Sequence, residues 1–486
     1  MDLITAIRDE QNRTTTENGA NAARSSGSFL VDLYAVCGAL RYRDPNEIRS
    51  MFLRALSEDP LLSVKLAFYT RDVREGLGER DTARIFFRTL SLCRPEVLKP
   101  NLSLIPEYGR WDDLFSLLGT PLEEEVLAIL KTQLEKDTVS LREEKPISLL
   151  AKWMPGVNAS ASKTRKTARF LSRKFGMNEK TYRKTLSALR TRLNLTETNL
   201  SEKTPERIVY EAVPSLAMKR YRNAFRRTDG ERFSAYLEAV KEGRAAIHSS
   251  VLYPYDIVES YLNKPSSGMD PVLEEQWKAL PDLSRNDARY LIMADVSGSM
   301  WGRAMATAVG LAIYFAERNT GPFHNRFMTF SARPELVEIR GDSLYEKVLG
   351  IQNADWMANT DLEAAFLLIL ESAVSHQLPP SEMPSSLIVI TDMEFDSCTR
   401  HTNRLFSEAM KERFEEAGYE LPNLVFWNVN ARHNTFHADC DMPRIQLASG
   451  QSVHVFESLL AGEFLNPYES MVTTLNSKRY DPIRIE

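Results

Sequence analysis

Oxygen-bearing side chains cluster at the ends of two apolar runs of the sequence. In "LIMADVSGSM" the apolar residues lead directly into Asp295, Ser297 and Ser299, and "SSLIVITD" ends in Asp392. A loop, "MANTDLEAAF", adds Thr360. Hydroxyl and carboxylate oxygens in near-octahedral order suit Mg²⁺ or Mn²⁺, because these ions prefer oxygen ligands and Mg²⁺ keeps several waters. The sequence therefore predicts an oxygen-only metal site, which we expect to lie on a solvated rim.

Other interpretations of these residues remain open at this point. Asp295 and Ser297 are also suited to cap a helix in an ordinary α/β turn. Hydrolysis by Asp295 and Asp392 is disfavoured, because no nucleophile and base accompany them. We therefore expect no enzymatic activity. His433, His437 and Cys440 have a spacing compatible with zinc, but no fourth ligand is evident.

The elements that must position the oxygen cluster alternate between strands and helices. Short β-rich runs, "RYLIMADVS", "NRFMTFS", "SSLIVITD" and "NLVFWNVNA", are separated by helical segments such as "RAMATAVGLAIYFAERN" and "LEAAFLLILESAVSHQ". This pattern predicts a doubly wound α/β domain with a mostly parallel sheet over residues 288–486. Ligands of such sheets bind beyond the carboxyl ends of the strands, so Asp295 and Asp392 are expected to converge.

The remainder of the chain differs in its composition and in the spacing of its apolar residues. Residues 1–28, rich in Asn, Thr, Ser and Ala, predict an extended and loosely held arm. Residues 29–262 show apolar spacing typical of helices and predict an all-α repeat, as a ring or a horseshoe. "NKPSSGMDP" begins a segment, 263–287, whose composition predicts a linker.

Charge is distributed unevenly along the chain. The net charge is −5, yet residues 163–232 contain 19 Lys and Arg against 7 Asp and Glu. This segment therefore carries +12 and the remainder −17, which predicts a basic surface for an anionic partner. Solvated faces of amphipathic helices are the alternative. The candidate RNA-binding cations are Lys163, Arg165, Lys166, Arg169, Arg173, Lys174, Arg183, Lys184, Arg190, Lys219, Arg220 and Arg222.

Three aromatic residues, Tyr182, Tyr221 and Phe225, are interleaved with these cations. Cations bind a nucleic-acid backbone, and exposed rings stack on bases. The alternative for the rings is core packing on amphipathic helices, which we favour.

Bulk properties indicate a globular protein outside the membrane. At 486 residues the chain is long enough for two or three domains. We find no apolar run near the roughly 18 residues of a membrane-spanning helix and no secretory signal. The four scattered cysteines fit a reduced compartment. We therefore expect a cytoplasmic monomer.

The C-terminal part, residues 288–486, resembles a von Willebrand factor A domain. "DVSGS" matches the start of the metal-ion-dependent adhesion site of that family. The resemblance implies that Ser297, Ser299 and Thr360 bind the cation, and that Asp295 and Asp392 act largely through water.

The helical part also resembles a known architecture, over about residues 15–480 when both parts are taken together. Segments such as "AFYTRDVREGLGERDTARIFFRTL", "IPEYGRWDDLFSLL" and "AVPSLAMKRYRNAFRRTD" resemble an uncharacterised family that joins a helical TROVE-like region to an A domain. Its better-known relatives are the Ro autoantigen proteins, in which a ring of HEAT-like repeats is closed by the A domain. Those proteins bind small noncoding RNAs on a basic face and take up single-stranded ends of misfolded RNA.

These observations lead to one functional hypothesis and one alternative. The chain is expected to be a non-enzymatic, Ro-like RNA-binding protein that recognises small structured RNAs or the ends of misfolded RNAs. The alternative is a protein-interaction scaffold, whose A domain binds a carboxylate of its partner through Mg²⁺.

Overall fold

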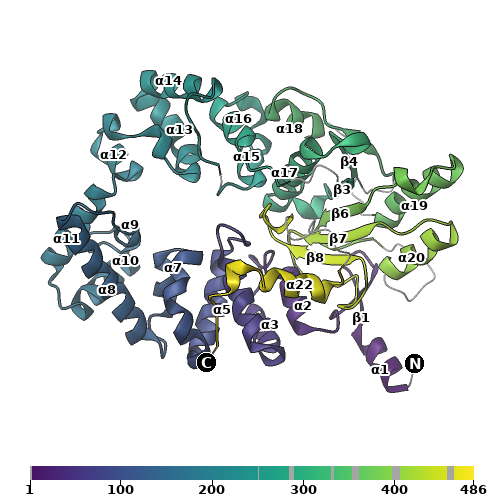
Figure 1. Cartoon of the computed structure of the whole chain (residues 1–486), viewed down its shortest axis with the longest axis horizontal. Coiled ribbons are helices and arrows are strands. Elements are labelled where there is room, and N and C mark those ends of the chain that lie inside the picture. The colour runs from purple at the N-terminus through teal and green to yellow at the C-terminus, as the bar shows by residue number, and fades with distance from the viewer. Residues whose placement is uncertain are drawn as a thin grey trace.

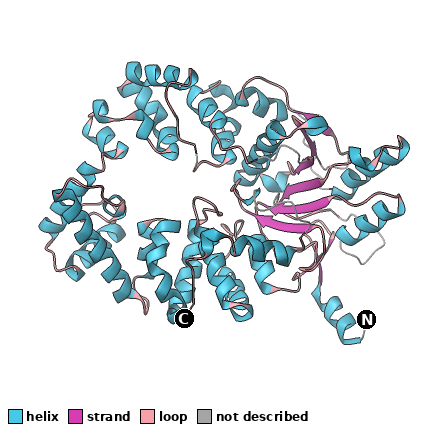
Figure 2. Cartoon of the chain, viewed as in Figure 1, coloured by secondary structure: helices cyan, strands magenta, loops and turns pink. Residues whose placement is uncertain are grey.

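The computed structural model describes residues 3–249, 251–283, 289–329, 333–352, 361–396, 406–456 and 465–485. Helices make up the N-terminal part, and one mixed sheet with its helices makes up the C-terminal part (Figures 1 and 2). The sequence predicted this division.

The helices of the N-terminal part begin where the sequence supplies capping residues. Asp59 accepts a hydrogen bond from the Leu62 N–H at 2.8 Å, and Pro60 occupies the first helical position. Proline is favoured there because its missing N–H would have no partner within the helix. The helices are α1 (Leu3–Asn12), α2 (Phe29–Val36), α3 (Pro45–Glu58), α4 (Pro60–Arg71), α5 (Arg80–Cys93), α6 (Pro95–Leu98), α7 (Ile105–Tyr108), α8 (Glu123–Arg142), α9 (Leu150–Trp153), α10 (Ser162–Lys174), α11 (Glu179–Arg192), α12 (Thr196–Glu202), α13 (Ser215–Thr228), α14 (Gly230–Lys241), α15 (Pro254–Leu262) and α16 (Pro271–Lys278).

The sheet of the C-terminal part has six strands within the described ranges, in the order β5-β4-β3-β6-β7-β8. All neighbours are parallel except the edge pair β4–β5. Without β5, this is the 2-1-3-4-5 order of doubly wound folds. The strands are β3 (Tyr290–Ala294), β4 (Arg326–Thr329), β5 (Leu336–Glu338), β6 (Ser386–Thr391), β7 (Asn423–Asn428) and β8 (Ile445–Ser449). The helices are α17 (Arg303–Arg318), α18 (Leu344–Gln352), α19 (Leu362–Ser375), α20 (Phe406–Glu416) and α22 (Pro467–Leu475).

The expected loose arm at the N-terminus is wrong for most of its length. Besides α1, it forms an antiparallel hairpin of β1 (Arg13–Thr15) and β2 (Asn21–Ala23). The hairpin packs on the α/β part, where the Thr16 hydroxyl donates to the Phe395 carbonyl at 2.6 Å. These contacts are tertiary, so the polar composition of the segment did not reveal them.

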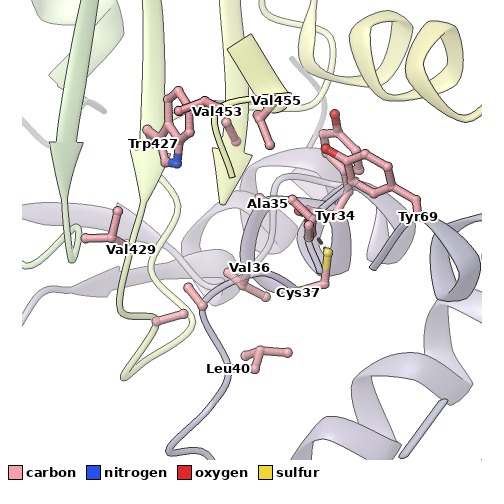
Figure 3. Packing of buried hydrophobic residues seen from close by; sticks show 14 of the residues in the cluster. Tyr34, Ala35, Val36, Cys37, Leu40, Tyr69, Trp427, Val429, Val453 and Val455 are labelled. Atoms are coloured by element: carbon pink, nitrogen blue, oxygen red, sulfur yellow. Dashed lines mark hydrogen bonds between the residues drawn. The ribbon is translucent and has the colours of Figure 1, made fainter. Parts of the chain in front are cut away.

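The start of the helical part shares a core with the sheet. Tyr34 and Val36 of α2, and Cys37 directly after it, pack near Trp427 and Val455 (Figure 3). The backbones also approach closely, because a Cβ on Gly38 would lie 2.6 Å from the Ser449 carbonyl oxygen. Only glycine fits such a contact.

The end of the helical part meets the sheet domain as well. The predicted linker, 263–287, instead contains α16, whose Glu274 accepts a hydrogen bond from the Leu344 N–H at 2.8 Å. This helix is largely buried, so the linker prediction is wrong there; α16 buries the apolar side chains of its sequence against α13, α15 and α18. Figure 1 shows that α2 to α16 follow an arc, and both ends of this arc contact the α/β part.

The C-terminal segment forms a third connection between the two parts. Arg479 donates to both carboxylate oxygens of Asp72, at 2.8 and 3.1 Å. Arg484 and Asn101 exchange two hydrogen bonds through the Arg484 backbone, at 3.1 and 2.6 Å. The chain thus returns from the sheet to the first helices.

Candidate metal centre and nucleic-acid interface

Asp295 and Asp392 follow adjacent parallel strands, β3 and β6, at the point where the strand order reverses. Ligands of doubly wound sheets bind at this position. Asp295 is 2 % exposed and accepts hydrogen bonds from the Ser297 N–H at 2.8 Å and from the Thr391 hydroxyl at 2.7 Å. The predicted convergence of the two carboxylates is therefore present, and Thr391 is a positioning residue that holds one of them.

The hydroxyl oxygens of Ser297 and Ser299 lie 3.0 Å apart. Oxygen ligands about 2.1 Å from an octahedral Mg²⁺ are about 3 Å from their neighbours, so this spacing fits two adjacent ligands. Ser299 is exposed and Ser297 is buried, which leaves an approach from one side. The described residues fit a hard divalent cation.

Asp392 already has a cationic neighbour. Arg432 donates to the Asp392 carboxylate at 3.0 Å, and Glu17 of the hairpin tip accepts from Arg432 at 2.7 Å. His433 contacts the same Glu17 carboxylate at 2.9 Å, and this hydrogen bond lowers the pKa of Glu17. The N-terminal hairpin therefore borders the candidate site, which the sequence did not indicate.

Burial and charge repulsion both raise the pKa of Asp295, to about 6. Removal from water is the larger cause, and the negative charge of the nearby Asp392 is the second. A divalent cation would favour the ionised form and offset both effects.

Several expectations for the metal centre differ from the structure. The expectation that the site lies on a solvated rim is wrong, because Asp295, Ser297 and Asp392 are all buried. Thr360 lies outside the described residues. The helix-capping interpretation fails at Ser297, because no side-chain cap hydrogen bond forms there before the short 3₁₀ helix η6 (Gly298–Met300). Asp295 does accept a hydrogen bond from the Ser297 N–H two residues ahead, so its role in an ordinary turn stands beside the metal hypothesis. Among the described residues, no group of three or more His, Cys, Asp or Glu side chains is arranged to hold a metal, which removes the zinc alternative.

The basic segment divides into exposed and structural cations. On α10 and α11, which pack together, exposed cations point away from the buried face of each helix. No ion pair forms to six of them in the described part of the chain. We call this set the cationic face: Lys163, Lys166, Arg173, Lys180, Arg183 and Lys184. Lys180 was not predicted, although its spacing of three and four residues from the last two members places it on the same side of the helix.

Other predicted cations hold the fold. Arg190 donates to the carbonyls of Ala151 and Met154 at 2.9 and 2.6 Å, and Arg222 donates to Asp270 at 2.7 Å. Arg165 donates to the Ala159 carbonyl at 2.7 Å. Lys219 is partly buried, 3.9 Å from Asp256. These four residues are not free for an anionic partner.

The remaining predicted cations are exposed. Arg169 pairs with Glu179 at 3.1 Å, and Lys174 pairs with Glu124 at 2.7 Å. Arg220 on α13 has no ion pair in the described ranges.

The aromatic residues of this segment belong to the core. Tyr182 is buried and donates to the Pro155 carbonyl at 3.0 Å, and Phe225 is buried against Tyr210. Tyr221 is partly buried beside Phe225. Core packing, the favoured interpretation, is confirmed for Tyr182 and Phe225.

No helix in the described ranges is both long enough and apolar enough to cross a membrane.

Comparison with known proteins gives a curated relative and a similar solved structure. The chain is 27 % identical over 518 aligned positions to "Uncharacterized protein L728" of Acanthamoeba polyphaga mimivirus, an alignment that covers 98 % of this chain and 89 % of the relative. The crystal structure of the Deinococcus radiodurans RO (RSR) protein is similar with a TM-score of 0.49 and 17 % identity, over 93 % of this chain and 99 % of that one.

Family comparison matches both parts of the chain. Residues 290–482 match the family described as "Domain of unknown function (DUF7788)". This description names no activity, so a von Willebrand A domain with its metal site stays a prediction. Residues 16–132 and 122–287, more than half of the chain, match the family described as "Domain of unknown function (DUF2828)". The chain therefore belongs to the DUF2828 family.

Proposed function

We propose that this chain binds RNA through the cationic face of α10 and α11, and that it acts by binding rather than by catalysis. The observation that carries the proposal is the set of exposed cations on two packed helices, without acidic partners among the described residues. Unpaired surface cations release counterions from a phosphate backbone, which is the main source of affinity in such complexes. The choice of RNA among polyanions rests on the resemblance of the helical motifs to the TROVE region.

The acidic remainder of the chain supports a localised site. Since the rest of the chain carries −17, a polyanion is repelled from most of the surface and attracted to one region. The ligands we propose are small structured RNAs or single-stranded ends of misfolded RNAs.

We further propose a Mg²⁺ or Mn²⁺ site at the end of β3. Ser297 and Ser299 would bind the cation directly, and Asp295 and Asp392 would act largely through water. Arg432 lowers the negative charge available at Asp392, so weak binding is expected. A bound cation would offer an open position to an acidic group of a partner.

The RNA proposal is tested by fluorescence anisotropy with a short labelled RNA. Changing Lys163, Lys166 and Arg173 to Glu should weaken binding at least tenfold, because three phosphate contacts become repulsive. The matched control changes Lys241, Arg244 and Lys278 to Glu, which alters net charge equally on cations that already have acidic partners. Equal affinities for both triple variants would contradict the proposal.

The metal proposal is tested by calorimetry. Wild-type protein should bind one Mn²⁺ or Mg²⁺ per chain, and Ser297→Ala should abolish this binding while the RNA affinity of the remote cationic face persists. If wild-type protein shows no heat of binding with either ion, the metal site is wrong. If RNA binding fails while a protein partner is retained only in the presence of the metal, the scaffold alternative replaces the RNA function.

A further inference from the structure

Two aromatic side chains project from the surface where the helical and α/β parts meet. Trp301 is 87 % exposed and Tyr42 is 81 % exposed. Trp301 lies two residues after Ser299 of the candidate metal centre, and Tyr42 lies in the turn between α2 and α3. Exposed rings of this size contribute nothing to the core and are typical of binding surfaces.

Both rings line one open pocket of about 150 Å³. A single water needs roughly 10–15 Å³, so the pocket has room for a larger group. Its lining comes from both parts of the chain, and a Cβ on Gly302 would meet no atom within 4 Å, so this residue leaves the space beside it open. The pocket therefore has space for a group larger than water, bordered by two aromatic rings.

The charges around the pocket favour an anionic ligand. Arg41 and Arg303 line it, and no Asp or Glu does so in the described ranges. The Arg41 guanidinium is held by Glu79 at 2.7 Å, whereas Arg303 lies over the Tyr255 ring at 5.0 Å. Arg303 is therefore the cation available to a phosphate.

We propose that this pocket holds one unpaired nucleobase of a single-stranded RNA. The base stacks between the rings of Trp301 and Tyr42, and the adjoining phosphate contacts Arg303. The inference rests on the proposed RNA function and adds the class of RNA, because a paired base cannot enter the pocket.

The test compares a short, unstructured, labelled RNA with a duplex of the same sequence. Trp301→Ala and Tyr42→Ala should each weaken binding of the single strand by about 5- to 150-fold, the range found for loss of one base–aromatic stack. Trp301→Phe should retain most of the affinity, and duplex affinity should not change in any of the three variants. Both residues are exposed, so circular dichroism and the thermal midpoint should match the wild type.

The possible failures are distinguishable. If the alanine variants bind the single strand as the wild type does, while the Lys163/Lys166/Arg173 variant does not, the pocket is wrong and the RNA function stands. If the alanine variants weaken the duplex equally, the rings do not bind an unpaired base and the pocket is again wrong. If wild-type protein binds neither RNA, the proposed function is wrong and the pocket proposal fails with it.

Discussion

Two stretches of the helical part that are rich in cations differ in how the structure uses them. They are "TRDVREGLGERDTAR" (70–84) and "KTRKTARFLSRK" (163–174). In the first, Arg71 is 2 % exposed and pairs at 2.7 Å with Asp113, which is fully buried. In the second, every cation of α10 except the partly buried Arg165 is exposed. The first stretch contains acidic residues among its arginines and the second contains none. Asp113 lies 42 residues from Arg71 in the sequence, so the comparison teaches that tertiary acidic partners, and not only the acids within a stretch, decide whether a cation is structural or free.

The largest expected effect is at the buried pair. Arg71→Met should lower the free energy of unfolding by about 3 kcal/mol, because it removes one partner of the completely buried Asp113 carboxylate. Arg84 still donates to Asp113 at 2.7 Å, which keeps the loss at the lower end of the usual range. Urea unfolding followed by circular dichroism measures the change. A loss below about 1 kcal/mol would remove the distinction between the two stretches.

A smaller effect is expected at a structural cation inside the basic segment. Arg190→Ala should cost about 1–3 kcal/mol, since the Ala151 and Met154 carbonyls lose their donor. Lys184→Ala, on the exposed side of the same helix, should stay within about 0.5 kcal/mol of the wild type. Equal costs for both variants in the same unfolding assay would show that the cationic face is not separate from the structural cations.

The smallest effect is expected at an exposed ion pair. A double-mutant cycle of Arg169→Ala and Glu179→Ala should give a coupling energy below about 1 kcal/mol that decreases with added salt. Both side chains are more than half exposed, so water screens their attraction. A larger coupling that is insensitive to salt would place this pair with the buried network instead.

The sequence was most informative where one pattern has one physical solution. The runs that became β3, β6 and β7 are apolar on both faces, as central parallel strands must be. β5 was missed because it is a three-residue edge strand with an exposed residue at each end. β8 was missed although it is buried throughout.

The candidate sites show the same division. Asp295 and Asp392 converge because strand ends meet at a switch point, which sequence order alone predicts. Arg432 and Glu17 come from loops whose positions depend on tertiary packing, so no local pattern indicated them. The sequence could not show that Arg190 is structural and Lys184 is exposed, because this depends on which side of α11 is buried.

The salt dependence of RNA binding tests the central claim most directly. If the cationic face neutralises about 5 phosphates of a single strand, a plot of log K against log salt should have a slope near −3.5, at about −0.7 per phosphate. The Lys163/Lys166/Arg173 to Glu variant should reduce the steepness by about 2. An affinity indifferent to salt, or an unchanged slope in the variant, would contradict RNA binding by this face.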